Sequence, residues 1–185
     1  MKPTMFKVLY LGIVGVTVLS ALACGKKDSS NGAPTTSGPL EPSMMFPSVD
    51  VFTVDGETVN TTALTQGHDS IVIFVSLGCE SCEELISTWK SMIDQIPDDL
   101  SVFALAEDEP EFAKQFVEEE DFPFPLYCED KGIFARDYKI GVFPSVVGTT
   151  ADGTVAFVGK MVTPEFTPAR AMDLLEKVKK AREEE

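Results

Sequence analysis

Two runs of apolar residues predict buried strands, and a shorter run predicts a third strand. Ser70–Leu77 is almost uninterrupted and rich in β-branched and aromatic residues, as is typical of a parallel strand covered on both faces. Leu100–Ala106 has the same character, and Phe124–Tyr127 is a shorter run that follows a proline. We therefore expect these segments to form strands of one sheet.

Two pairs of alternating segments predict β-hairpins at either end of this region. One pair flanks Asp55-Gly56 and the other flanks Asp152-Gly153, and this dipeptide favours a two-residue hairpin turn. The four predicted hairpin strands are Ser48–Val54, Glu57–Thr61, Ser145–Thr150 and Thr154–Val158.

Apolar residues at helical spacing predict helices between and after the strands. One helix begins directly after Gly78, a second covers Pro110–Glu120, a short one covers Gly132–Tyr138, and the last begins at Thr167-Pro168. The residues expected to face the core are Leu85, Ile86, Trp89, Met92, Ile93 and Ile96 in the first helix, Phe112, Phe116 and Val117 in the second, and Ala171, Leu174, Leu175 and Val178 in the last.

This order of elements indicates an α/β fold: a mixed central sheet flanked by helices, with an N-terminal hairpin. The length of 185 residues fits one such domain. The formal charge of −15 argues against a nucleic-acid partner, because contacts to phosphates need clustered Lys and Arg. A single His makes a His-based catalytic triad or a multi-His metal site a poor explanation of the chain.

The first 45 residues differ in composition from the rest. Lys2 and Lys7 precede an apolar run that ends in small residues, a pattern typical of a signal peptide over 1–23. Ser20-Ala21-Leu22-Ala23-Cys24 resembles the bacterial lipobox, which implies that Cys24 is lipidated and becomes the new N-terminus. We expect residues 24–45, rich in Ser, Thr, Pro and Gly, to form a flexible tether, with the folded domain at 46–185 on the outer side of a membrane in a bacterial cell envelope.

Candidate chemistry is concentrated at Cys79-Glu80-Ser81-Cys82, where a buried strand meets a helix. This spacing brings the two sulfurs within reach of a disulfide in the first helical turn. The unpaired N–H groups and partial positive charge of a helix N-terminus favour a thiolate at Cys79. Cys82, one turn further on and more covered, would then be the resolving thiol.

Two other interpretations of this pair are weaker. A zinc site needs two more ligands, and the chain offers only Cys128 and His68 without a second Cys-x-x-Cys or a His pair. A purely structural disulfide would close so short a loop that it restrains the unfolded chain little. We therefore expect no metal and no cofactor.

From about Pro47 to Lys180 the sequence resembles thioredoxin-fold proteins of the TlpA/ResA type, which are exported thiol–disulfide oxidoreductases related to the AhpC/TSA peroxiredoxins. The features that match are the N-terminal hairpin, the strand leading into the Cys-x-x-Cys motif, an inserted helix and strand at 110–127, and Val142-Phe143-Pro144-Ser145. The resemblance implies that Pro144 is cis, lies against the two cysteines and leaves the Phe143 backbone free to pair with substrate. It also implies that Glu80 tunes the Cys79 thiolate.

The chain departs from this family at four positions. Gly78 stands where relatives have Trp, and Ser81 stands where many have Pro. Ile73 and Leu85 occupy positions where thioredoxins or reductases of this type carry an acid, so the proton acceptor for the buried thiol is unassigned.

The predicted function is therefore that of a membrane-anchored thiol–disulfide oxidoreductase that acts on exported proteins and exchanges electrons with an upstream donor. Apocytochrome c is one candidate substrate. Because Glu80 opposes ionisation and the motif has no basic residue, we expect a reduction potential nearer about −270 mV than about −120 mV, on the reducing side. Alternatives are a peroxiredoxin-like peroxidase and a redox-inert or metal-binding scaffold. Cys128 is a possible extra redox thiol or a free buried cysteine.

Overall fold

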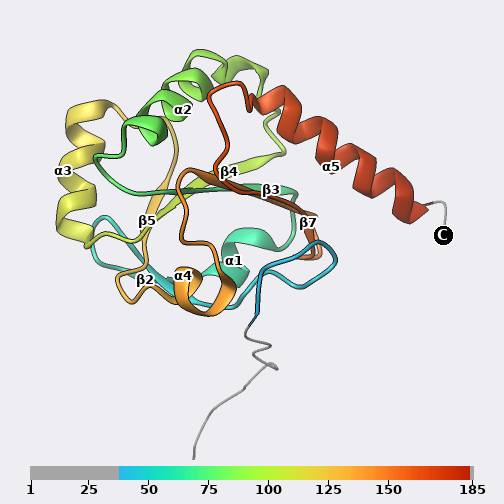
Figure 1. Ribbon diagram of the computed structural model, residues 1–185, viewed down its shortest axis with the longest axis horizontal. Coiled ribbons are helices and arrows are strands. Elements are labelled where there is room, and N and C mark those ends of the chain that lie inside the picture. Colours follow the sequence, from blue (N-terminus) through green and yellow to red (C-terminus); the bar gives the residue numbers. More distant parts are fainter. Residues whose placement is uncertain (1–37, 184–185) are drawn as a thin grey trace, which may run out of the picture. The chain divides into compact units, whose positions relative to one another are not determined.

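The structure is a computed structural model that describes residues 38–183 (Figure 1). The predicted signal peptide, the lipidation at Cys24 and most of the predicted tether lie outside these residues. Packing begins before residue 46, where composition suggested that the domain starts. The Leu40 side chain is 2% exposed, and its backbone N–H donates to the Tyr138 carbonyl.

The described residues contain one seven-stranded mixed sheet in the order β2-β1-β5-β4-β3-β6-β7. Its centre is the parallel set β3 (Ser70–Val75), β4 (Ser101–Ala106) and β5 (Leu126–Cys128). All six residues of β3 are buried, which confirms the prediction made from its apolar run. The register places Val75 beside Ala106 and Ala106 beside Cys128, so the carboxyl ends of the three strands lie at one edge.

Both predicted hairpins are present. β1 (Asp50–Thr53) pairs antiparallel with β2 (Thr58–Asn60). The expected two-residue turn is wrong, because the Thr53 N–H donates to the Glu57 carbonyl and leaves three residues, 54–56, in the turn. Gly56 ends this turn with a φ of 82°, a conformation accessible to glycine. β6 (Ser145–Thr149) pairs antiparallel with β7 (Val155–Gly159). β1 extends the sheet beyond β5 and β6 extends it beyond β3, each antiparallel to its neighbour, so the sheet is mixed as expected.

Helices cover both faces of the sheet (Figure 1). One face packs against α2 (Glu80–Ser91), α3 (Pro110–Glu120) and α5 (Pro168–Glu183), in a core that contains Ile71, Ile73 and Val75. The other face packs against α4 (Ile133–Tyr138), α1 (Thr61–Thr65) and the segment before β1. A 3-10 turn at Ile93–Gln95 follows α2, so the Ile93 side chain, which was expected in the core, is instead 43% exposed. Among the described residues, no helix combines the length and apolar character needed to cross a membrane.

The prediction that Phe112 faces the core is wrong. Its side chain is 63% exposed, and the buried residue of α3 is Ala113. The stripe that packs inward combines Ala113 with Phe116 and Val117, at spacings of three and four residues, which leaves Phe112 on the solvent side. The five-residue helix α1 was not predicted. It begins after Asn60, whose side chain accepts a hydrogen bond from the Thr62 N–H.

Candidate active site

The turn between β3 and α2 holds the first cysteine of the motif at a helix N-terminus. Gly78 has a φ of 77°, a left-handed conformation that is strained for other residues, which explains a glycine before the motif. Cys79 is the N-cap residue of α2. Its carbonyl accepts hydrogen bonds from the N–H groups of Cys82 (2.9 Å) and Glu83 (3.0 Å), which anchors the first turn.

The Cys79 thiol is half-buried and is surrounded by donors. Its Sγ lies 3.2 Å from the Ser81 Oγ. Partial burial raises the pKa of Cys79, but hydrogen bonds from the side chains and backbone N–H groups of Cys82 and Ser81 outweigh it, so the pKa lies below its ordinary value. The geometry therefore favours a thiolate at Cys79, as the sequence predicted.

Cys82 has the opposite character. Its residue exposure is 3%, and burial, the adjacent Cys79 and the charge of Glu83 raise its pKa to about 12 despite a backbone hydrogen bond to Ser76. Both cysteines are free thiols in this structure. One half-exposed thiolate thus lies beside one buried thiol, an arrangement suited to attack by the first and resolution by the second.

Ser81 is a site residue that sequence reasoning missed. In the sequence it is marked only as a replacement for proline, whereas its hydroxyl is within hydrogen-bond distance of the Cys79 sulfur. Glu80 lies exposed in the first turn of α2. The contacts that shift the pKa of Cys79 come from Ser81 and Cys82, so the tuning role of Glu80 remains a prediction.

The Phe143–Pro144 peptide bond is cis, as the resemblance implied. Pro144 is buried and immediately precedes β6, whose first residue, Ser145, lies beside Phe74 near the carboxyl end of β3. The Pro144 carbonyl accepts a hydrogen bond from the Val162 N–H (3.0 Å). This register places Pro144 at the edge of the sheet from which the motif departs. Its contact with substrate remains a prediction.

Cys128 ends β5 at the same edge of the sheet. Its side chain is fully buried, and burial together with the charges of Asp108 and Asp130 raises its pKa to about 11. A protonated, covered thiol is a poor nucleophile. These features favour the interpretation of Cys128 as a free buried cysteine over its interpretation as an extra redox thiol.

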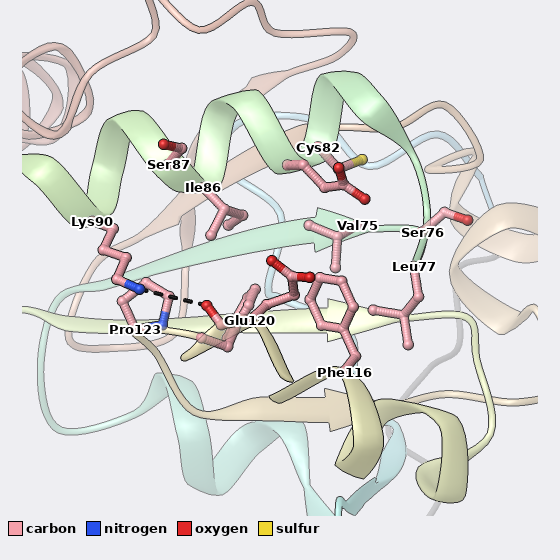
Figure 2. A pocket seen from close by; sticks show the side chains of 12 residues that line it. Val75, Ser76, Leu77, Cys82, Ile86, Ser87, Lys90, Phe116, Glu120 and Pro123 are labelled. Carbon is pink, nitrogen blue, oxygen red and sulfur yellow. Dashed lines mark hydrogen bonds between the residues drawn. The ribbon is translucent and has the colours of Figure 1, made fainter. Parts of the chain in front are cut away.

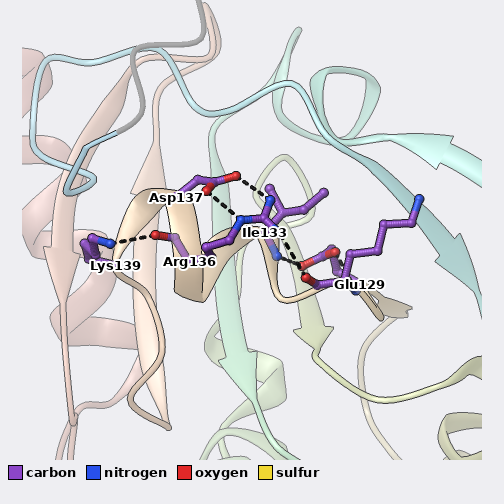
Figure 3. A network of polar contacts seen from close by, with 6 residues as sticks. Glu129, Ile133, Arg136, Asp137 and Lys139 are labelled. Atoms are coloured by element: carbon purple, nitrogen blue, oxygen red, sulfur yellow. Dashed lines mark hydrogen bonds and ion pairs between the residues drawn. The ribbon is translucent and has the colours of Figure 1, made fainter.

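Three carboxyl groups also lie at this edge, and no motif in the sequence marks them. The Asp108 carboxylate accepts a hydrogen bond from the Leu77 N–H (3.1 Å) and so steadies the turn before Cys79. Glu129 is 2% exposed and accepts from the N–H groups of Lys131 and Ile133 at the start of α4 (Figure 3). Burial and the nearby charge of Glu129 raise the pKa of Glu107. The described residues contain no group of three or more His, Cys, Asp or Glu placed to hold a metal ion.

A cavity of about 210 Å³ opens between α2 and α3 beside the motif. Ile86 of α2 and Phe116 of α3 point into it from opposite sides (Figure 2). Most of its lining is apolar and includes Val75, Leu77, Cys82, Ile86, Phe116 and Phe122. The buried thiol therefore forms part of a cavity wall.

Known proteins share a family profile and the fold with this chain. The sequence profile of the AhpC/TSA family matches residues 42–158. No curated protein matches the chain. The fold is similar to that of peroxidoxin BcpB from Mycobacterium tuberculosis (TM-score 0.65, 13% identity), with 75% of this chain and 97% of that one covered.

Two further solved structures share the fold. A Chlorobium tepidum protein classified as a thiol:disulfide interchange protein DsbE has a TM-score of 0.64 at 17% identity, with 76% of this chain and 99% of that one covered. StoA from Bacillus subtilis has a TM-score of 0.52 at 18% identity, with 67% and 95% covered. These structures confirm the thioredoxin-like fold class.

Proposed function

Because the chain belongs to the AhpC/TSA family, we propose that it is a thiol–disulfide oxidoreductase that reacts through Cys79 and Cys82. The observation that carries the proposal is the contrast between the two thiols. Cys79 is half-buried with a lowered pKa, whereas Cys82 is buried with a raised pKa. Such a pair separates the attacking group from the resolving group before substrate arrives.

The reaction exchanges one disulfide for another. The Cys79 thiolate attacks one sulfur of a substrate disulfide, that S–S bond breaks, and the second substrate sulfur leaves as a thiolate that takes up a proton. Cys82 then loses its proton and attacks the Cys79 sulfur. The mixed disulfide breaks, the substrate's first sulfur leaves as a thiol, and a Cys79–Cys82 disulfide remains. Two electrons have passed to the substrate, and an external dithiol restores the reduced protein.

The reducing direction is supported by the kind of donors around Cys79. The groups that lower its pKa are the neutral thiol, hydroxyl and backbone N–H groups of Cys82 and Ser81. A thiolate held by neutral donors stabilises the reduced form less than one held by a cation, which keeps the potential on the reducing side. The expected potential of the reduced–oxidised couple is below about −150 mV, measured by equilibration with glutathione or dithiothreitol.

The test of the dithiol mechanism is trapping of the mixed disulfide. Cys82→Ser should accumulate a covalent adduct with a disulfide-containing protein through Cys79, and Cys79→Ser should not. Equal trapping by both variants would contradict the assignment of roles. The reduced wild type should consume hydrogen peroxide slowly relative to its reaction with disulfides. Rapid peroxide consumption would favour the peroxidase alternative.

The substrates are proposed to be exported proteins, apocytochrome c among them, met by a domain that a lipid on Cys24 holds at a membrane. The support is the lipobox-like Ser20-Ala21-Leu22-Ala23-Cys24 after an apolar run. In a bacterial host, Cys24→Ser should leave unprocessed precursor and lose labelling by a radioactive fatty acid, while Cys128→Ser should keep both processing and label. Labelling that persists in Cys24→Ser would exclude this anchor.

A further inference from the structure

The cavity between α2 and α3 lies directly beside the reacting thiols. Cys82 forms part of its wall, and Ser76 and Leu77, which lead into Cys79, line the same side (Figure 2). A polypeptide whose cysteine is bonded to Cys79 therefore has the cavity within reach of a neighbouring residue. With about 30 Å³ for each water molecule in the liquid, the volume of about 210 Å³ corresponds to roughly seven waters. This is room for one large side chain.

The walls and the rim of the cavity differ in character. The walls are apolar, with Ile86, Phe116 and Phe122 among the lining residues, and they favour an apolar side chain. The rim carries the carboxylates of Glu83 and Glu120, neither of which has a cation partner among the described residues. Both residues are exposed.

The cation at this rim is already engaged. Lys90 forms an ion pair with Asp121 (3.0 Å), and its ammonium also donates to the backbone carbonyls of Glu120 and Asp121. Glu83 and Glu120 therefore leave the rim with a negative field. A ligand that matches both features has an apolar side chain for the walls and positive charge for the rim.

We propose that this cavity is a substrate subsite that accepts an apolar side chain flanked by Lys or Arg, close in sequence to the cysteine of the substrate disulfide. The inference rests on the proposed dithiol function and specifies its substrate class: basic, partly unfolded polypeptides. Glu83 and Glu120 act as specificity residues through charge, whereas Ile86 and Phe116 act through shape.

The test uses three peptides, each carrying one cysteine as a mixed disulfide with neutral 2-thiopyridine. One peptide has Phe-Lys-Lys next to the cysteine, the second Phe-Glu-Glu and the third Ala-Lys-Lys. In a single turnover, the Cys79 thiolate attacks the peptide sulfur, a mixed disulfide forms and 2-thiopyridone is released and measured by absorbance. The reduced wild type should react fastest with Phe-Lys-Lys, and its preference over Phe-Glu-Glu should shrink in high salt.

Matched variants separate the rim from the total charge of the protein. Glu83→Gln with Glu120→Gln should lower the Lys-to-Glu rate ratio by roughly two- to fivefold for each charge removed. Glu84→Gln with Glu118→Gln removes the same charge from exposed positions of the same two helices, outside the cavity lining, and should leave the ratio near that of the wild type. Equal loss in both double variants would assign the preference to total charge and overturn the subsite.

Filling the cavity tests its apolar part. Ser87 lines the cavity from α2 and is exposed, so Ser87→Trp should lower the Phe-to-Ala rate ratio without removing a core residue. Ser91→Trp, one turn later on α2, should not. If the wild type reacts with 2,2′-dipyridyl disulfide but shows no preference among the peptides, the subsite is wrong and the proposed role of Cys79 as attacking thiol stands. If it reacts with none of the four disulfides, the function itself fails.

Discussion

Replacing Ser81 by Ala should weaken the thiolate at Cys79. The Ser81 hydroxyl lies 3.2 Å from the Cys79 sulfur and is one of the groups that lower the pKa of that thiol. Ser81→Ala removes this donor and leaves the backbone N–H donors in place. The pKa of Cys79 should therefore rise toward its ordinary value.

The magnitude follows from the strength of hydrogen bonds to charged groups. Such bonds contribute about 1.5–3 kcal/mol when covered, and this one is exposed to water, so we take about 1 kcal/mol. That free energy corresponds to a roughly fivefold smaller thiolate population at neutral pH. Because 30 mV corresponds to about 1.4 kcal/mol for this two-electron couple, the reduction potential should fall by no more than about 20 mV.

The assay is the rate of alkylation of Cys79 by iodoacetamide as a function of pH, in a Cys128→Ala background. Ser81→Ala should react several-fold more slowly than the parent near pH 7. The two proteins should react equally fast at high pH, where Cys79 is ionised in each of them. Ser81→Thr keeps a hydroxyl and should restore most of the rate, while Ser81→Val, of similar shape to Thr, should not. Equal profiles for Ser81→Thr and Ser81→Val would refute the role of the hydroxyl.

Three further predictions concern groups around the site. Trp89 is fully buried and its indole N–H donates to the Phe166 carbonyl (2.6 Å), so Trp89→Phe should lower the free energy of unfolding by about 2–4 kcal/mol. Urea denaturation followed by circular dichroism measures this change, and a loss below about 1 kcal/mol would contradict the packing. The pKa of Glu107 is raised in the folded state, so the folded protein binds this proton more tightly than the unfolded chain, and the stability that Glu107 contributes falls as pH rises through the folded pKa. Glu107→Gln should therefore gain stability relative to the wild type between about pH 5 and pH 8. A difference in stability that does not change with pH would exclude this. Cys128 should resist iodoacetamide in the folded protein at pH 8 and react in urea, whereas equal labelling of Cys79 and Cys128 in the folded state would show that Cys128 is accessible.

The sequence was most informative where one local signal determines structure. The apolar run of β3, the Asp-Gly signal for the first hairpin and the helix that begins at the two cysteines each act over a few residues, and these three elements are confirmed. The length of the hairpin turn is not, because it has three residues where two were expected. The order of strands depends on contacts between distant segments. That β1 pairs with β5, for example, was not visible in the pattern of either strand.

Helix phase was less predictable for α3, because its apolar residues fit two overlapping stripes. Phe112 and Phe116 are four residues apart, and so are Ala113 and Val117. In the structure α3 packs against β5 and turns Ala113 and Val117 inward together with Phe116. A small residue such as Ala113 brings a helix close to a sheet, but hydrophobicity alone ranks Phe above Ala and so favoured the wrong residue.

The site was predicted where its chemistry lies in the cysteines and missed where it lies in their surroundings. Asp108 is 31 residues from Leu77 in sequence, yet it accepts the Leu77 N–H two residues before Cys79. No periodicity or spacing marks such a residue in a single sequence. Ser81 is adjacent to Cys82, but the sequence marks it only as a replacement for proline. Its role depends on the position of its hydroxyl beside the Cys79 sulfur, which the sequence does not specify.

The first turn of α2 links the stability of the helix to the state of the cysteine. Cys79 occupies the N-cap position, where Ser, Thr, Asp or Asn is common because an oxygen acceptor satisfies unpaired N–H groups. A neutral thiol is a weak acceptor and makes no such bond here, but the backbone N–H groups of Ser81 and Cys82 are among the donors that favour the thiolate. Ionisation of Cys79 therefore completes the cap that the sequence leaves open. Formation of a disulfide with Cys82 removes that charge, so the helix and the reduced thiolate stabilise each other. A polar donor at position 81 adds to this mutual stabilisation, whereas a proline there would donate no hydrogen bond to the Cys79 thiolate.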